Sequence, residues 1–182
     1  MRVFVGVDLP PELKHAIMEL LQPYLRQIQG KHVEKENLHI TLKFYGDITP
    51  AQLEIVKKIL DESVKDLQPA EIIIKGVGAF PSPANPRVLW LGVQGPGALL
   101  LKELFLRIEI RSQKHGLRRE EHEYTPHVTV SRLKAGGRAV QKFLEELQEQ
   151  VFGKFIVTKI TVFKSTLTPR GPIYEKLAET EL

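Results

Sequence analysis

The chain has 182 residues, of which 42% are hydrophobic and 26% are charged, a balance typical of a soluble globular protein with one domain or two small lobes. It contains no cysteine, which excludes disulfides, thiolate nucleophiles, Cys-based zinc sites and Cys-ligated iron–sulfur clusters. The 26 Lys and Arg exceed the 22 Asp and Glu by 4, so a polyanionic partner is permitted but not required.

The sequence shows no targeting or membrane segment. Asp8 and the pair Pro10-Pro11 interrupt the first apolar run before it reaches the length of a signal peptide. No stretch approaches the roughly 18–20 continuous apolar residues of a membrane span. We therefore expect a cytoplasmic protein without membrane association.

The first half of the chain alternates between strand and helix patterns. Pro10-Pro11 suits the first turn of a helix, and Thr49-Pro50-Ala51-Gln52 matches a capping box with proline at the first helical position. The expected elements are strands at 3–7, 38–45 and 71–80, and helices whose apolar residues span 13–28 and 53–67.

The second half repeats this order after a turn-rich segment, Pro81–Pro86. The expected elements are strands at 88–93, 124–130 and 155–163, helices whose apolar residues span 101–108 and 140–151, and an edge strand at 166–177. Landmarks keep a near-constant offset, 86 positions from Gly6 to Gly92 and 88 from His39 to His127. The sequence therefore predicts a duplicated α+β fold with lobes at roughly 1–85 and 86–182, whose shared cleft is the natural place for a site.

Two mirrored motifs could place chemistry in that cleft: His39-Ile40-Thr41-Leu42 and His127-Val128-Thr129-Val130. On a strand, residues two apart point to the same face, so each motif presents an imidazole and a hydroxyl side by side. In a chain with 6 His, chance predicts roughly 0.3 occurrences of His-x-Thr. Two copies at matching places therefore indicate a function.

Two imidazoles and two hydroxyls suit an acid–base displacement at phosphorus. One neutral histidine takes a proton from the attacking oxygen, and the other, protonated, gives one to the leaving oxygen. The threonine hydroxyls can donate hydrogen bonds to phosphoryl oxygens where negative charge develops. This chemistry needs no metal and no organic cofactor.

Other interpretations of these histidines remain open. A single His-x-Thr is an ordinary strand pattern, with threonine present for its β propensity. A zinc site from His115, His122 and His127 is a rival, although their spacing fits no usual template. His15 and His32 are assigned no role.

Five segments resemble one known family: Asn37–Gly46, Tyr124–Arg132, Phe4–Asp8, Phe80–Pro83 and Arg87–Val93. Together they look like the 2H phosphoesterase superfamily and, within it, the RNA 2′,3′-cyclic phosphodiesterases, also called 2′-5′ RNA ligases. The similarity covers essentially the whole chain. It implies two lobes, each a mostly antiparallel sheet with two helices on its outer face, facing each other across a central cleft.

The resemblance implies hydrolysis of a terminal ribose 2′,3′-cyclic phosphate on RNA to a 2′-phosphate, with possible 2′-5′ ligation as the reverse chemistry. By position, His39 would donate a proton to the departing 3′ oxygen and His127 would activate water. The near-symmetric motifs do not themselves decide which histidine does which. Thr41 and Thr129 would bind the phosphate, and Arg132 either adds a charged contact or is a solvated strand-end residue.

Aromatic and basic residues near the motifs suggest how an RNA end could be held. Tyr45 and Tyr124 could stack a terminal base, as in many proteins that bind single-stranded RNA. Strand alternation places Tyr45 with His39 and places Phe44 on the opposite face, in the core. A basic stretch either guides the strand or is a solvated helix end: Arg107, Arg111, Lys114, His115, Arg118 and Arg119.

Two further functions remain open. One is a related 2H enzyme that acts on 2′-5′ oligonucleotides or small cyclic nucleotides. The other is a nucleotide- or RNA-binding module without catalysis, although binding alone does not need two titrating groups. The expected partner is RNA with 2′,3′-cyclic phosphate ends, and the expected state is a monomer.

Overall fold

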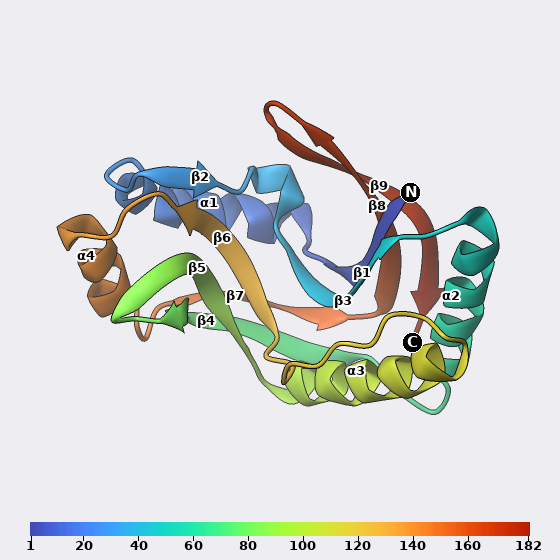
Figure 1. Cartoon of the computed structure of the whole chain (residues 1–182). Helices are drawn as coiled ribbons and strands as arrows, with labels where there is room; N and C mark the ends of the chain where they lie inside the picture. The colour runs from blue at the N-terminus through green and yellow to red at the C-terminus, as the bar shows by residue number, and fades with distance from the viewer.

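A computed structural model describes all residues 1–182 and shows one curved sheet of nine antiparallel strands (Figure 1). The strands run in the order β7-β4-β5-β6-β3-β1-β8-β9, and β2 pairs with the far end of β6. Their bounds are β1 (Arg2–Asp8), β2 (Gly30–His32), β3 (His39–Asp47), β4 (Ala70–Ser82), β5 (Asn85–Gln94), β6 (His127–Leu133), β7 (Val151–Val157), β8 (Lys159–Thr168) and β9 (Gly171–Glu181).

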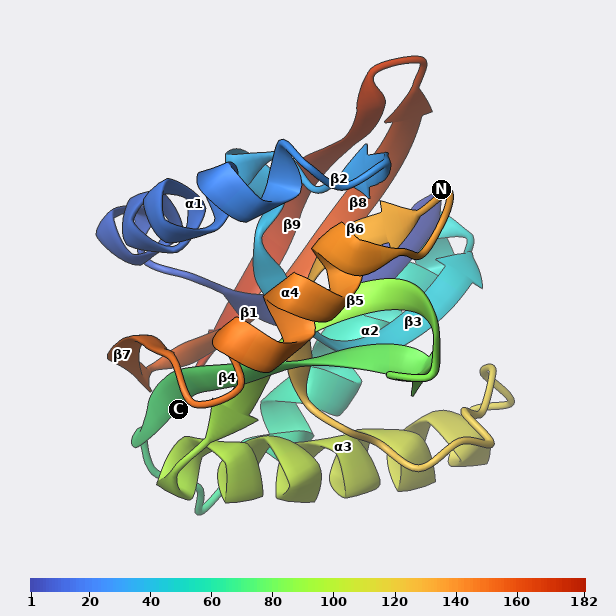
Figure 2. The ribbon, with the colours of Figure 1, turned by 90° about the vertical axis from the view of Figure 1, so that its left-hand side faces the viewer.

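Four helices pack their apolar faces on the sheet: α1 (Pro11–Leu25), α2 (Pro50–Ser63), α3 (Pro96–Lys114) and α4 (Arg138–Glu146). A short 3₁₀ turn, η1 (Lys35–Asn37), precedes β3. The capping box that the sequence predicts is present, since Thr49 Oγ1 accepts from the Gln52 N–H and the Gln52 side chain accepts from the Thr49 N–H. Figures 1 and 2 together place α1, α3 and α4 around the sheet and not within its concave side.

The two halves of the chain exchange their third strands. β4 comes before residue 85 but pairs with β5 and β7, and β8 comes late in the chain but pairs with β1. The two halves of the sheet are therefore β9-β8-β1-β3 and β6-β5-β4-β7. This pairing differs from a division of the structure into contiguous lobes at 1–85 and 86–182.

Three local expectations are wrong. Residues 155–163 form no single strand, because β7 ends at Val157, where the chain leaves β4 for β1. The fourth helix ends at Glu146, and Val151 begins β7. The strand expected at 124–130 begins at His127 and reaches Leu133, where it also pairs with the unexpected β2.

No helix of this fold is long and apolar enough to cross a membrane.

Candidate active site

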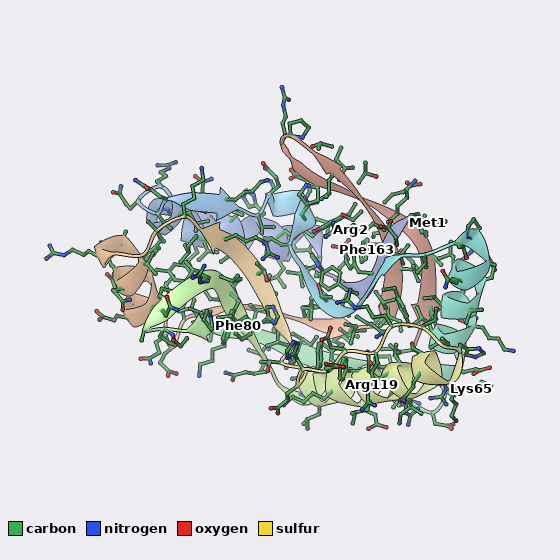
Figure 3. All side chains as sticks on the ribbon, viewed as in Figure 1. Met1, Arg2, Lys65, Phe80, Arg119 and Phe163 are labelled. Atoms are coloured by element: carbon green, nitrogen blue, oxygen red, sulfur yellow. The ribbon has the colours of Figure 1, made fainter.

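A cavity of about 630 Å³ occupies the concave side of the sheet. Its lining comes from β2, β3, β6, the β8–β9 hairpin and the loop before β6. Figure 3 labels Phe80 on β4 and Phe163 on β8, aromatic residues whose rings lie 5.0 Å from His127 and 6.3 Å from His39, measured between centroids. The cavity therefore lies between the two halves of the sheet.

The centre of the cavity is the place where β3 and β6 meet. The two strands pair antiparallel through Ile40 and Val128, whose fully buried side chains point into the core. The flanking side chains point to the other face, and His39, Thr41, His127 and Thr129 all line the cavity. Antiparallel register then sets His39 opposite Thr129 and His127 opposite Thr41.

Matched bulges follow the two motifs. The register of β1 on β3 skips Leu42, and the register of β5 on β6 skips Val130, the equivalent position 88 residues later. The bulge buries two successive residues in each strand, and the residue after them is exposed. Lys43 and Ser131 are thus buried equivalents.

The exposed residues after the bulges are Phe44 and Arg132, and both line the cavity. Phe44 is 45% exposed, whereas Tyr45 is 4% exposed and its hydroxyl lies 2.7 Å from Ser112 Oγ on α3. The expectation that Tyr45 faces the site and Phe44 the core is therefore wrong. The reason is the bulge at Leu42, which shifts the alternation by one residue beyond that point.

The register of these strands also corrects the alignment of the two halves. Gly6 pairs with Thr41, and the residue that pairs with Thr129 is Trp90, not Gly92. A side chain at Gly6 would meet the carbonyl oxygen of Ile40, 2.6 Å from the position of a Cβ, so glycine is needed at this close approach.

Both histidines are oriented by the same kind of hydrogen bond. His39 Nδ1 lies 2.6 Å from the carbonyl oxygen of Asn37, and His127 Nδ1 lies 2.7 Å from that of Thr125. A carbonyl oxygen only accepts, so each Nδ1 carries its hydrogen. Each Nε2 is then left to take or give a proton.

Burial lowers the pKa of both histidines and keeps them neutral more readily than free imidazole. For His39, the Asn37 carbonyl and the charge of Asp8 oppose this effect, while Lys14 and His127 add to it. For His127, the Thr125 carbonyl opposes it and Arg132 adds to it. The residue that pairs with His39 is Asp8, and the equivalent partner of His127 is Gly92.

The Nε2 atoms of the two histidines have different surroundings. His39 Nε2 lies 2.8 Å from Thr41 Oγ1, whereas His127 Nε2 makes no hydrogen bond within the protein. Tyr124 supports the same strand, because its hydroxyl donates to the Thr41 carbonyl at 2.8 Å and its ring stacks on Phe105 with 4.7 Å between centroids. Burial raises the pKa of Tyr124. Tyr124 is thus a wall of the cavity beside Thr41.

Sequence reasoning missed several lining residues. Lys31 on β2 and Arg170 and Tyr174 on the β8–β9 hairpin line the cavity, and the Tyr174 ring stands edge-on to His39 at 5.3 Å. No local signal identifies them, because long-range pairing brings them there. Of the basic stretch expected near RNA, Arg107 pairs with Glu103 and Arg111 with Glu62, and none of its six residues lines the cavity.

The structure contains no group of three or more His, Asp or Glu side chains arranged to hold a metal ion. His115, His122 and His127 therefore form no such cluster, although His122 and His127 both line the cavity.

Comparison with known proteins follows the duplication seen in the chain. The family described as LigT-like phosphoesterase matches twice, over residues 7–90 and 91–174. An RNA 2′,3′-cyclic phosphodiesterase of Methanothermobacter thermautotrophicus is 38% identical over 178 residues, covering 95% of this chain and 94% of its own. The enzyme of the same name from Methanocaldococcus jannaschii is 36% identical over 182 residues, covering 98% and 99%.

Solved structures agree with the fold. A crystal structure from Thermus thermophilus has a TM-score of 0.80 and 27% identity, and covers 100% of this chain and 98% of its own. E. coli LigT complexed with 3′-AMP has a TM-score of 0.81, 21% identity and coverage of 100% and 97%, which bears on the fold alone. The expected two-lobed 2H fold is thus confirmed, and the chain belongs to the family of LigT-like phosphoesterases.

Proposed function

We propose that this protein hydrolyses a terminal ribose 2′,3′-cyclic phosphate on RNA and leaves a 2′-phosphate. The observation that carries the proposal is the pair of imidazoles in one cavity, each fixed at Nδ1 by a carbonyl so that Nε2 remains for proton transfer. The name shared by the relatives supports the substrate class. A binding module would need phosphate donors but not two such proton carriers.

The reaction needs one base and one acid. His127 Nε2 takes a proton from water as the water oxygen attacks phosphorus, and protonated His39 Nε2 gives a proton to O3′ as the P–O3′ bond breaks. The products are a 2′-phosphate, a free 3′-hydroxyl, a protonated His127 and a neutral His39, and proton exchange with solvent restores the enzyme. No metal or organic cofactor takes part.

The charges around the histidines support this assignment. The negative charge of Asp8 favours the protonated form of His39, as an acid requires. The positive charge of Arg132 disfavours protonation of His127, as a base requires. Thr41 and Thr129 donate hydrogen bonds to the phosphoryl oxygens as charge develops, and Arg132 adds an ionic contact to the substrate.

The same geometry permits the reverse chemistry. A 5′-hydroxyl in place of water would attack the cyclic phosphate and leave a 2′-5′ linkage. Both motifs belong to one chain, which supports a monomer as the active unit.

Turnover of a nucleoside 2′,3′-cyclic phosphate in excess EDTA tests the proposal. We expect His39→Ala and His127→Ala each to lower kcat by about 10²–10⁴, because each removes one proton-transfer step. His15→Ala is the matched control, since His15 is exposed on α1 and pairs only with Glu19. The product should carry its phosphate on O2′, as phosphorus NMR can establish.

Three results would contradict the proposal. Complete loss of activity in EDTA would exclude the metal-free route. Tight binding of the RNA end without turnover between about pH 5 and 8 would favour a binding module. Faster turnover of 2′-5′-linked dinucleotides or small cyclic nucleotides in the same assay would favour a related 2H substrate.

A further inference from the structure

The charges along the cavity are unequally distributed between its two ends. Of the lining cations, Lys43 is paired with Glu109, whereas Lys31, Arg132 and Arg170 make no ion pair within 4.0 Å. Glu120 and Glu123 line the cavity from the loop that leads into β6. A polyanion in this cavity therefore meets attraction at one end and repulsion at the other.

The cationic end is formed by β2, the end of β6 and the β8–β9 hairpin. Lys31 and Arg132 are register partners on adjacent antiparallel strands, so their side chains emerge on the same face. The hairpin that carries Arg170 is held against η1 by Asn37 Nδ2, which donates to the Pro172 carbonyl at 2.9 Å. Figures 1 and 2 both show the free end of this hairpin on the same side of the molecule as β2. Glu34 is the one carboxylate of the lining at this end.

The acidic end is fixed next to Phe44. The Glu120 N–H donates to Glu109 Oε2 at 2.9 Å, and Glu109 forms a buried ion pair with Lys43, the neighbour of Phe44. Arg118 and Arg119 precede this loop, and Figure 3 shows Arg119 beside α3, but neither lines the cavity. This end thus presents an aromatic face with carboxylates around it and no lining cation free for a phosphate.

The ribose itself decides how a nucleotide fits between these ends. C2′ and C3′, which carry the cyclic phosphate, lie between C1′, which carries the base, and C4′, which leads to the 5′ phosphate. With the cyclic phosphate between the histidines, the base and the 5′ phosphate must point to opposite ends. Phe44 offers a stacking surface for the base, and Lys31, Arg132 and Arg170 offer charge for the phosphate.

This orientation agrees with the proton donor. Because β3 and β6 pair through Ile40 and Val128, His39 lies toward the Arg132 end of the cavity and His127 toward the Phe44 end. O3′ is on the C4′ side of the ribose and so faces the end where His39 lies. The leaving oxygen O3′ and the proposed acid His39 thus lie at the same end of the cavity.

We infer that Lys31 and Arg170 bind the phosphodiester backbone on the 5′ side of the reacting nucleotide, so that the strand leaves the cavity between β2 and the β8–β9 hairpin. The inference rests on the proposed function and names the residues that give an RNA end a higher kcat/KM than a mononucleotide with the same cyclic phosphate. The preference is ionic, so it weakens with salt.

The test compares two substrates that share a terminal nucleoside 2′,3′-cyclic phosphate, a mononucleotide and a tetranucleotide, over a series of salt concentrations. For the wild-type protein, we expect a higher kcat/KM on the tetranucleotide at low salt and a decline of that advantage with salt. Lys31→Ala and Arg170→Ala should each lower the ratio of the two kcat/KM values and reduce its logarithmic salt slope by about 0.7, the value for one phosphate contact of a single strand. Lys31→Arg should restore most of the ratio.

The matched control is Lys58→Ala, because Lys58 is exposed on α2, makes no ion pair and lies outside the cavity lining. It removes the same charge and should leave the ratio unchanged. An equal loss on both substrates, an equal loss in the control, or a wild-type ratio that does not respond to salt would overturn the inference.

A binding measurement separates this inference from the proposed reaction. Fluorescence anisotropy with a labelled tetranucleotide that ends in a 2′-phosphate reports on the strand path without turnover. We expect Lys31→Ala and Arg170→Ala to weaken this binding and Lys58→Ala to leave it intact. Unchanged binding in the first two variants overturns the strand path, whereas normal binding with no turnover of either cyclic phosphate overturns the proposed reaction.

Discussion

The β3 side and the β6 side of the site share a backbone and differ in the side chains around it. Both strands have the same bulge after His-x-Thr and the same sequence of buried and exposed positions. The equivalent positions then hold different groups: Lys43 and Ser131 in the core, Phe44 and Arg132 in the cavity, Asp8 and Gly92 opposite the histidines. The two halves thus share the backbone that orients the imidazoles, while the residues around each imidazole differ and give each histidine a different role.

The buried pair of equivalents shows how each catalytic strand is fixed. Lys43 forms its ion pair with Glu109 on α3, and its Nζ lies 5.1 Å from the centre of the Tyr45 ring. Ser131 Oγ lies 2.8 Å from His32 Nδ1 on β2. Each strand is therefore tied to an element that borders the cavity, by an ion pair in β3 and by a single hydrogen bond in β6.

Removing these two ties should give the largest difference between the halves. Lys43→Met leaves the Glu109 carboxylate buried without its counter-ion, and we expect a loss of about 3–5 kcal/mol in the free energy of unfolding. Ser131→Ala leaves one ring nitrogen without a partner and should cost about 1–2 kcal/mol. Urea unfolding followed by circular dichroism measures both.

The double variant Lys43→Met/Glu109→Leu is the control for the charge argument. Replacing both partners removes the stranded charge, so most of the lost stability should return. A double variant no more stable than Lys43→Met would show that packing, and not the uncompensated carboxylate, causes the loss.

Prediction of side-chain direction from the sequence fails beyond the bulge in β3. His39 and Thr41 precede the skipped residue Leu42, so simple alternation places both in the cavity. Tyr45 follows the skipped residue, so its side chain points to the opposite face from the one that simple alternation predicts. The cause is the pairing of Gly6 with Thr41, which joins distant parts of the chain and leaves no local pattern. Local propensity acts over a few residues, whereas the register of a strand is set by its partner.

The same limit explains the residues that were missed. Lys31 has no strand pattern of its own, since β2 has three residues and exists by pairing with β6. Arg170 reaches the cavity because its hairpin continues β8, which the exchange of strands places beside β1. The helices, the capping box and the mirrored motifs depend on short segments and are predicted from them. The places of Lys31 and Arg170 depend on topology and are not.

Of the two exposed residues that follow the bulges, Phe44 should bind the base and Arg132 a phosphate. Phe44→Ala should raise KM about tenfold for a nucleoside 2′,3′-cyclic phosphate, because stacking of a base on an aromatic ring contributes about 1–3 kcal/mol. The same variant should leave KM unchanged for ribose 2′,3′-cyclic phosphate, which has no base. Steady-state kinetics on the two substrates measures the contrast.

Tyr45→Phe is the matched control for the stacking residue. It removes only the hydroxyl that meets Ser112 in the core, so KM should stay constant while stability falls by about 1 kcal/mol. If Phe44→Ala left KM for the nucleoside 2′,3′-cyclic phosphate unchanged, the base would not stack on Phe44 and the register argument would be wrong.

The charges near the histidines should give the smallest effect, one that appears in the pH profile of kcat/KM. Asp8 faces His39 from β1 and binds Lys14 on α1 and Lys176 on β9. Burial raises the pKa of Asp8, but its bonds to these two lysines outweigh burial and hold the pKa below its usual value, so Asp8 is charged at neutral pH. Asp8→Asn therefore removes a charge that favours protonated His39 and lowers the pKa of His39 further.

The two limbs of the pH profile should then move in opposite directions in the two variants. An acid must be protonated, so activity falls as pH rises through the pKa of His39, and Asp8→Asn should move this alkaline limb to lower pH. A base must be neutral, so activity falls as pH drops through the pKa of His127; Arg132→Gln removes a charge that lowers this pKa and should move the acid limb to higher pH. Asp8→Asn should change kcat/KM by less than about tenfold at any pH, because one partly screened charge contributes at most about 1 kcal/mol. Arg132→Gln also loses its contact with the substrate, so kcat/KM falls at every pH, and the position of the acid limb reports on His127. If the two variants moved the opposite limbs, the acid and base would be exchanged between β3 and β6, and O3′ would leave toward His127.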